Sequence, residues 1–337
     1  MNMNSFEPKY TQFALCNEMI QVTEIIKNYD SNVAKPFVNA VLRKQNLLLT
    51  GEGSSRIFPA KHFRYQLLAN GIDFNVVIEG ATQSLEYKLD DYVVFGVSNS
   101  GKTKELAELF SKLKADNHPA FFGITATHGT PVEKLPQASV VLTCGKEEAV
   151  AATKSVMEQA LFFDSLLCEA FNMEKPSFTI LSEKIEAVLS THIDQKFVEI
   201  LAKAPVIYFA GRNDGVAEEL ALKTNEITRK KSDFLEGTYA LHGIEEVMNT
   251  GETLVVIDPF EQEEEKFRSI LEKGAGVDVI AISSRKTIFP TIQIPDAGTF
   301  KNYIELAAGW NLLVETGLAL GVDLDKPSRA RKIGNEA

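Results

Sequence analysis

Residues 92–103 read YVVFGVSNSGKT, an apolar run that ends in a turn of serine, asparagine and glycine. The run is short and continuous, which is typical of a strand buried on both faces of a parallel sheet. A helix is expected next, over about residues 102–116. This strand, turn and helix predict a unit of an α/β fold.

The same unit recurs on both sides of this stretch. Apolar runs predict strands at 47–49, 74–78, 121–125 and 140–143, with helices to about residue 69 and over about 151–171. The residues before about position 35 have apolar side chains at helical spacing. Apolar runs that alternate with amphipathic helices predict parallel strands with helices on both faces.

The order of elements then repeats. Strands are expected at 206–209, 254–258, 277–282 and 291–294, with helices to about 230, to about 273 and over about 300–319. Gly53 and Gly211 lie 158 positions apart, which indicates an internal duplication. We therefore predict a helical segment at 1–35, one αβα unit at 36–175, a second at 176–323, and a tail at 324–337.

Composition narrows the function classes. The chain has 337 residues, 45% of them apolar, and a net charge of −11, so its field should repel nucleic acid and anionic membranes. No apolar run approaches the ~18 residues of a membrane span, and the first ten residues do not resemble a signal peptide. Three widely spaced cysteines fit no disulfide framework or zinc pattern. These features predict a cytoplasmic protein without a metal.

The turn after residues 92–97 is the strongest candidate binding motif. Ser98, Ser100 and Thr103 supply hydroxyls, and the start of a helix supplies backbone N–H groups, which together suit an anion. A second serine pair, Ser54-Ser55, follows the first strand, and ligands of parallel sheets bind at the carboxyl ends of strands. The alternative is that these residues only cap helices.

A competing reading is a nucleotide phosphate loop. Residues 96–103 fit GxxxxGK[ST], and Asp258 could follow as a metal-binding aspartate. Gly96, however, lies inside the predicted strand, and Asp258 belongs to the second sheet. A nucleotide site would need both motifs on one sheet, so we disfavour this reading.

The second half has no serine loop, because its matching strand ends in Asp258-Pro259-Phe260. It carries instead Lys223 and Glu226, three residues apart on one helix face, and His242 before a glycine. A carboxylate and a histidine can move protons between neighbouring sugar carbons. Each residue taken alone is more often a solvated or capping side chain.

With these motifs assembled, the chain resembles the sugar isomerase (SIS) superfamily over nearly its whole length. The matching stretches are Gly51–Ser55, Ser98–Thr103, Val150–Ser155, Glu219–Glu226, His242-Gly243 and Asp325–Lys332. The chain is most similar to double-SIS phosphosugar isomerases and amino-sugar-6-phosphate deaminases, which resemble the isomerase half of glutamine–fructose-6-phosphate aminotransferase. The resemblance implies two tandem αβα three-layer SIS units with parallel, flavodoxin-like sheets.

The resemblance also implies a role for each site residue. The phosphate would be held by Ser54, Ser55, Ser98, Asn99, Ser100 and Thr103, and the sugar would be lined by Gly53, Val150, Ala151 and Ala152. Glu226 would move the proton between C1 and C2, with Lys223 assisting. His242, from a second subunit of a homodimer, would open the ring, and Lys332 would close over the substrate. The family uses no metal or redox cofactor.

Three departures from the family pattern bear on activity. Ala152 stands where the aminotransferase has serine, Ile244 replaces the usual proline after His-Gly, and the tail before Lys332 differs. Residue 2 is asparagine, so we expect no ammonia production from glutamine.

Two other functions stay open. One is a DNA-binding regulator, which the short and weakly basic start of the chain disfavours. The other is a sugar-phosphate sensor without turnover.

Overall fold

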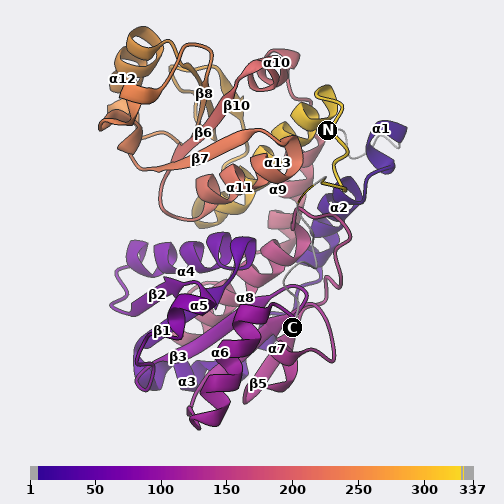
Figure 1. Cartoon of the computed structure of the whole chain (residues 1–337), viewed down its shortest axis with the longest axis vertical. Coiled ribbons are helices and arrows are strands. Elements are labelled where there is room, and N and C mark those ends of the chain that lie inside the picture. The colour runs from indigo at the N-terminus through magenta and orange to yellow at the C-terminus, as the bar shows by residue number, and fades with distance from the viewer. Residues whose placement is uncertain (1–6, 328, 330–337) are drawn as a thin grey trace. The chain divides into compact units, whose positions relative to one another are not determined.

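The computed structural model describes residues 7–327 and residue 329, which form two compact units (Figure 1). The first-sheet unit contains Glu24–Glu148, Ala152–Thr179 and Arg329. The second-sheet unit contains the described residues up to Thr23, the short segment Ala149–Ala151, and the chain from Ile180 to Pro327. Each unit is built on one five-stranded sheet in which every recorded strand pair is parallel.

The first sheet has the strand order β2-β1-β3-β4-β5. Its strands are β1 (Asn46–Gly51), β2 (Asn75–Glu79), β3 (Val93–Ser98), β4 (Phe121–Thr125) and β5 (Ala138–Val141). The helices are α3 (Lys35–Lys44), α4 (Ile57–Ala69), α5 (Ala81–Ser84), α6 (Lys104–Ala115), α7 (Pro131–Lys134) and α8 (Lys154–Phe171), with 3-10 turns η1 (Ser31–Ala34) and η2 (Gly53–Ser55).

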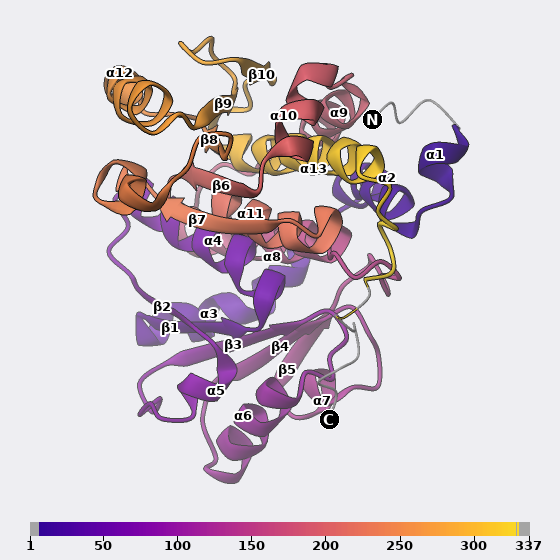
Figure 2. The ribbon, with the colours of Figure 1, turned by 45° about the horizontal axis from the view of Figure 1, so that its top comes forward.

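Helices cover both faces of this sheet (Figure 2). One face packs against α3, α4 and α8, where buried aromatic residues such as Phe37, Phe63 and Phe162 meet Phe95 of β3. The other face packs against α5, α6 and α7 through Leu106 and its neighbours. The predicted three-layer αβα arrangement is therefore confirmed for this unit.

The second sheet repeats the same topology, because its order β10-β9-β8-β6-β7 is the first order read from the other edge. Its strands are β6 (Val206–Gly211), β7 (Lys231–Glu236), β8 (Thr253–Ile257), β9 (Asp278–Ser283) and β10 (Thr291–Gln293). The helices are α9 (Phe178–Ser190), α10 (Gln195–Lys203), α11 (Val216–Thr228), α12 (Glu264–Phe267), the π-helix η6 (Arg268–Ala275) and α13 (Lys301–Ala319), with 3-10 turns η3 (Tyr239–Leu241), η4 (Ile244–Val247), η5 (Glu261–Glu263) and η7 (Gly298–Phe300). Two helices, α1 (Pro8–Thr11) and α2 (Ala14–Lys27), precede both sheets in sequence.

The duplication is visible in the glycines that end the first strand of each sheet. A Cβ on Gly51 would lie 2.6 Å from the Val97 carbonyl oxygen of β3, and one on Gly211 would lie 3.4 Å from the Ile257 carbonyl oxygen of β8. Both strands thus end where a neighbouring backbone comes close. Gly51 is the last residue of β1 and Gly211 is the last residue of β6. The structural counterpart of Gly211 is therefore Gly51 and not Gly53, which the sequence spacing had indicated.

Sequence reasoning missed β7. This strand lies at the edge of the second sheet, and its residues Lys231, Asp233 and Glu236 are exposed while Leu235 is buried. An edge strand with one solvated face carries no continuous apolar run, so the apolar pattern predicts no strand at residues 231–236.

Candidate active-site residues

The two serine turns of the first-sheet unit lie at the carboxyl ends of neighbouring strands. Gly51 of β1 pairs in register with Val97 of β3. Ser54 and Ser55 follow β1 in η2, and the turn from Ser98 follows β3, so both turns stand at the same edge of the sheet. This edge between β1 and β3 is the topological switch point, where doubly wound sheets bind ligands. Both turns therefore follow adjacent parallel strands of this unit.

Hydroxyl groups organise the turn after β3. The buried Ser98 Oγ lies 2.8 Å from Thr103 Oγ1 and accepts a hydrogen bond from the Gly101 N–H at 3.1 Å. Ser100 Oγ accepts from the Lys102 N–H at 3.2 Å. Thr103 is the N-cap residue of α6, so the turn feeds directly into the positive end of a helix dipole. Hydroxyl side chains gathered at the start of a helix are of the kind that suits a phosphate dianion.

Gly101 has a φ of 66°, in the left-handed region, and leaves no room for a side chain. A Cβ there would lie 2.2 Å from Thr130 Oγ1 and 2.5 Å from Thr125 Oγ1. Glycine is thus required twice, by backbone conformation and by contact.

Asn99 is held on its backbone and on its side chain. Its carbonyl oxygen accepts from the Ala126 N–H at 3.1 Å and from the hydroxyls of Thr125 and Thr127, each at 3.2 Å. Its side-chain amide donates to the buried carboxylate of Glu147. Sequence reasoning missed Glu147, although its place before the Val150–Ser155 motif was the available signal.

The residues expected to line the sugar differ in exposure. Gly53 is exposed with a φ of 54°, Ala151 is fully buried, and Val150 and Ala152 are half-buried. Ala152 belongs to the first-sheet unit, while Ala149–Ala151 cluster with the second. The segment therefore passes from one unit to the other and back within a few residues.

In the second-sheet unit, Lys223 lies between two carboxylates of α11. Its Nζ is 2.7 Å from Glu226 Oε2 and 3.1 Å from Glu219 Oε1. The side chains of Lys223 and Glu219 are fully buried, whereas that of Glu226 is 23% exposed. Burial alone would lower the pKa of Lys223, but the charges of Glu219 and Glu226 outweigh it and raise that pKa. The lysine is therefore a cation that fixes one oxygen of the solvent-facing Glu226 carboxylate.

His242 lies in an exposed loop of the same unit. It follows η3, donates its backbone N–H to the Tyr239 carbonyl at 3.0 Å, and has Nε2 3.4 Å from Thr238 Oγ1. Gly243 after it has a φ of 106°, so the chain turns sharply beside the imidazole. Tyr239 and Val247 on the same loop segment are exposed.

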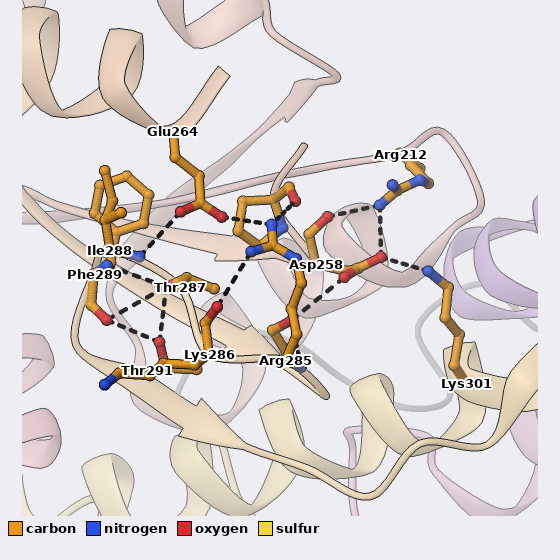
Figure 3. Close-up of polar contacts among 12 residues, drawn as sticks. Arg212, Asp258, Glu264, Arg285, Lys286, Thr287, Ile288, Phe289, Thr291 and Lys301 are labelled. Atoms are coloured by element: carbon orange, nitrogen blue, oxygen red, sulfur yellow. Dashed lines mark hydrogen bonds and ion pairs between the residues drawn. The ribbon is translucent and has the colours of Figure 1, made fainter. Parts of the chain in front are cut away.

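The edge of the second sheet that matches the serine turns carries ion pairs instead (Figure 3). Asp258, directly after β8, has a φ of 42°. Its carboxylate accepts from Arg212 Nη1 at 2.9 Å and from Lys301 Nζ. Burial opposes ionisation of Asp258, but the Lys301 hydrogen bond and the charges of Lys301, Arg212 and Arg285 lower its pKa. The prediction that this unit lacks a serine loop is confirmed. The carboxylate of Asp258 occupies the position after β8 that corresponds to the serine turn after β3.

Glu305 of α13 interacts electrostatically with the charges of this network, which are Lys301, Asp258 and Arg212. It is almost fully buried, and burial together with the charge of Asp214 raises the pKa of Glu305 to about 8. The raised pKa favours the protonated, uncharged form of this carboxyl group, which would reduce the negative charge around Asp258.

The structure also bears on the nucleotide-loop reading. Gly96 lies inside β3, where a Cβ would lie 2.4 Å from the ring of Phe110, and Asp258 follows a strand of the other sheet. Both objections raised from the sequence are confirmed. The two halves of a nucleotide motif are on separate sheets, so the reading is rejected.

Two further features concern metal-binding and thiol groups in the part of the chain that the structure describes. That part contains no group of three His, Cys, Asp or Glu side chains arranged to hold a metal ion. The three cysteines are buried free thiols, and burial raises the pKa of each. No helix within the described residues has the length and apolar character to cross a membrane.

Each unit thus brings together part of the predicted set. The residues predicted to hold a phosphate share one sheet edge: Ser54, Ser55, Ser98, Asn99, Ser100 and Thr103. Lys223 and Glu226 share one ion-pair network. Lys332 lies outside the described residues.

The sequence is similar to a known protein family and to one curated enzyme. Residues 41–168 match the family described as the SIS domain. The glutamine–fructose-6-phosphate aminotransferase [isomerizing] of Aeropyrum pernix is 25% identical over 264 residues, which is 71% of this chain and 43% of that protein. The chain therefore spans less than half the length of this curated relative.

Solved structures show the same fold over both units. Tagatose-6-phosphate ketose/aldose isomerase from Escherichia coli superposes with a TM-score of 0.76 at 18% identity, covering 96% of this chain and 99% of that chain. Glucosamine-6-phosphate deaminase from Thermotoga maritima gives a TM-score of 0.71 at 19% identity, covering 96% and 98%. The resemblance predicted from the motifs is confirmed: the chain carries a SIS domain at residues 41–168 and has, over both sheets, the fold of the double-SIS phosphosugar isomerases.

Proposed function

We propose that the chain is a phosphosugar isomerase or deaminase that acts on a hexose or hexosamine 6-phosphate by moving a proton between C1 and C2. The observation that carries the proposal is the paired serine turns at one sheet edge, together with a carboxylate held by a buried lysine. The solved structures with the same fold include a ketose/aldose isomerase and a glucosamine-6-phosphate deaminase, which supports this reaction class.

The phosphate is assigned to the serine turns. Five side-chain hydroxyls and one amide belong to Ser54, Ser55, Ser98, Asn99, Ser100 and Thr103. Because the protein has a net charge of −11, an anionic substrate must be held by local donors of this kind. Binding energy gained at the phosphate, remote from the reacting carbons, fixes the sugar for proton transfer.

Proton transfer is assigned to Glu226. Lys223 occupies Glu226 Oε2, and the partial exposure of the side chain leaves the carboxylate accessible to a substrate. A base whose orientation is fixed by a buried ion pair loses little entropy in the transition state. We assign to Lys223 the orientation of this base and assistance at the neighbouring hydroxyl.

The proposed steps balance without a cofactor. His242 moves the proton that opens the sugar ring, and Glu226 takes the proton from C2 or C1 and returns it to the other carbon through an enediol or enolamine. With a hydroxyl at C2 the product is the isomeric sugar phosphate. With an amine at C2, the resulting imine is hydrolysed by one water molecule, which releases ammonia and the ketose phosphate.

The exposed position of His242 is compatible with its use across a subunit interface, so we propose a homodimer in which each subunit supplies His242 to its partner. Lys332 is proposed to close over the substrate, as in the family resemblance. Both assignments are separate from the phosphate and Glu226 assignments and can fail without them.

The test is a substrate panel. The protein is incubated with hexose 6-phosphates and hexosamine 6-phosphates, and both ketose formation and ammonia release are measured. Isomerase activity predicts ketose without ammonia from a hexose phosphate, and deaminase activity predicts equal amounts of both from a hexosamine phosphate. Binding of a sugar phosphate without either product would replace the enzyme proposal by the sensor reading.

A further inference from the structure

Glu147 is a buried carboxylate in the first-sheet unit to which neither the sequence motifs nor the proposed reaction assigns a role. Its side chain is fully shielded from solvent, and both of its oxygens accept hydrogen bonds. A buried carboxylate is costly unless it is fully hydrogen-bonded, so its partners show what it holds in place.

One oxygen of Glu147 faces the start of α8. Oε1 accepts from the Thr153 N–H at 2.7 Å and from the Lys154 N–H at 2.9 Å. These are backbone donors at the positive end of an 18-residue helix, where a carboxylate is favoured. Ala152, expected to line the sugar, directly precedes Thr153. This oxygen therefore fixes the backbone next to the proposed sugar pocket.

The other oxygen faces the turn Ser98–Thr103, which is proposed to hold the phosphate and is called the phosphate turn below. Oε2 accepts from the side-chain amide of Asn99 and from the Ser155 hydroxyl. Asn99 lies between Ser98 and Ser100, so one carboxylate joins the middle of the phosphate turn to the first residues of α8. Asn99 and Thr153 are 54 positions apart in sequence, and no strand pairing joins the turn to the start of α8.

The carbonyl of Asn99 completes the argument. It is directed at the end of β4, where Ala126, Thr125 and Thr127 donate to it. The Ser100 N–H shares a planar trans peptide unit with this carbonyl and points the opposite way. None of the hydrogen bonds formed among the described residues uses the Ser100 N–H. With the side chain of Asn99 held by Glu147 and its carbonyl held by β4, this donor has a fixed direction.

We propose that Glu147 is a positioning residue that sets the phosphate turn relative to the start of α8, so that phosphate and sugar are held at one fixed spacing. It touches no reacting atom and acts through Asn99 and the backbone at Thr153. This inference rests on the proposed function, because it assigns the phosphate to the turn that contains Asn99.

A matched pair of variants tests the proposal. Glu147→Gln keeps the shape of the side chain but turns one acceptor into a donor that faces donors, and Glu148→Gln makes the same change at the exposed neighbouring residue. The binding probe is glucitol 6-phosphate, an open-chain polyol phosphate that cannot isomerise, measured by calorimetry well below the melting temperature of each variant. KM and kcat are measured with the best substrate of the panel.

We expect Glu147→Gln to weaken glucitol 6-phosphate binding about tenfold or more and to raise KM in parallel, with kcat within about threefold of wild type. Glu148→Gln should stay within about twofold of wild type on every measure. In a double-mutant cycle, Asn99→Ala should remove most of the effect of Glu147→Gln, because the two residues act as one unit.

The following results overturn the proposal in distinguishable ways. A folded Glu147→Gln variant that binds the probe as wild type does, with only a lower melting temperature, makes Glu147 purely structural. Additive losses in the cycle with Asn99→Ala contradict action through Asn99. Wild-type protein that neither binds nor converts any sugar phosphate refutes the proposed function, and this inference with it. If Glu147→Gln fails to fold, Ser155→Ala, which removes one donor to the same carboxylate, should weaken probe binding about threefold, and unchanged binding contradicts the proposal.

Discussion

Replacement of Lys223 by methionine should destabilise the second-sheet unit strongly, since the lysine is the buried counter-ion of two glutamates. Methionine has a similar length and no charge, so the variant removes the cation without a large cavity. Glu219, whose side chain has 0% exposure, would lose the ammonium group that lies 3.1 Å from its Oε1. Loss of one partner from a buried ion pair costs about 3–5 kcal/mol. For a unit of this size that corresponds to a fall in Tm on the order of 10 °C.

The loss should depend on pH in a defined direction. The folded-state pKa of Lys223 is raised above its usual 10.5, so in wild type its contribution is fully present below pH 10.5 and is lost as pH rises through the folded value. In the variant, a buried Glu219 without its lysine would have a raised pKa and would bind a proton at acid pH. The free-energy cost of keeping an ionised Glu219 buried in the variant therefore grows as pH rises above the ordinary glutamate pKa of about 4.3. The deficit should be small near pH 4.5 and largest at pH 7–9.

Urea unfolding followed by circular dichroism at pH 4.5, 7 and 9 measures this deficit. The control is Lys203→Met on α10 of the same unit, because Lys203 is 79% exposed and its nearest carboxylate, Glu199, lies 3.7 Å away. We expect a change below about 0.5 kcal/mol for the control. A deficit under about 1 kcal/mol for Lys223→Met, or one that does not vary with pH, would refute the role of Lys223 as a buried counter-ion.

Two further predictions concern one glycine and one carboxyl group. Gly101→Ala places a Cβ 2.2 Å from Thr130 Oγ1 at a φ of 66° and should cost about 2–4 kcal/mol in urea unfolding, whereas Gly71→Ala, at the same φ with no atom within 4 Å, should cost about 1 kcal/mol. Equal costs would contradict the packing argument. Because the pKa of Glu305 is raised to about 8, wild-type stability should fall between about pH 4.5 and 8, where only the folded state holds this proton. Glu305→Gln should therefore gain on wild type by up to about 1.4 kcal/mol per pH unit across that window, and parallel pH profiles would contradict the assignment.

Much of the fold was predictable because buried parallel strands carry continuous apolar runs. The run at 92–97 is β3 with one residue's difference at each end, and the repetition after residue 206 identified the second sheet. The polar edge strand β7 was missed, because its alternating exposure leaves no such run. Local periodicity therefore identifies central strands better than edge strands.

The candidate site also contains residues that the sequence predicts and residues that it does not. The serine turn after β3 was predictable since its polar residues are consecutive and interrupt an apolar run. Glu147 was not, because its partners Asn99 and Thr153 are brought to it only by the folded chain. The ion pair of Asp258 with Arg212 joins residues 46 positions apart and carries no periodic signal. Contacts between loops that follow different strands depend on sheet order, which a single sequence does not specify.

The most direct test of the proposed enzyme is Glu226→Gln, assayed for both turnover of the best panel substrate and binding of glucitol 6-phosphate. The amide keeps a hydrogen-bond acceptor for Lys223 but cannot take a proton from a sugar carbon. We predict that turnover falls at least about 10²-fold while the Kd of the polyol phosphate changes less than about threefold. Turnover retained within tenfold of wild type would remove Glu226 from the reaction and contradict the mechanism.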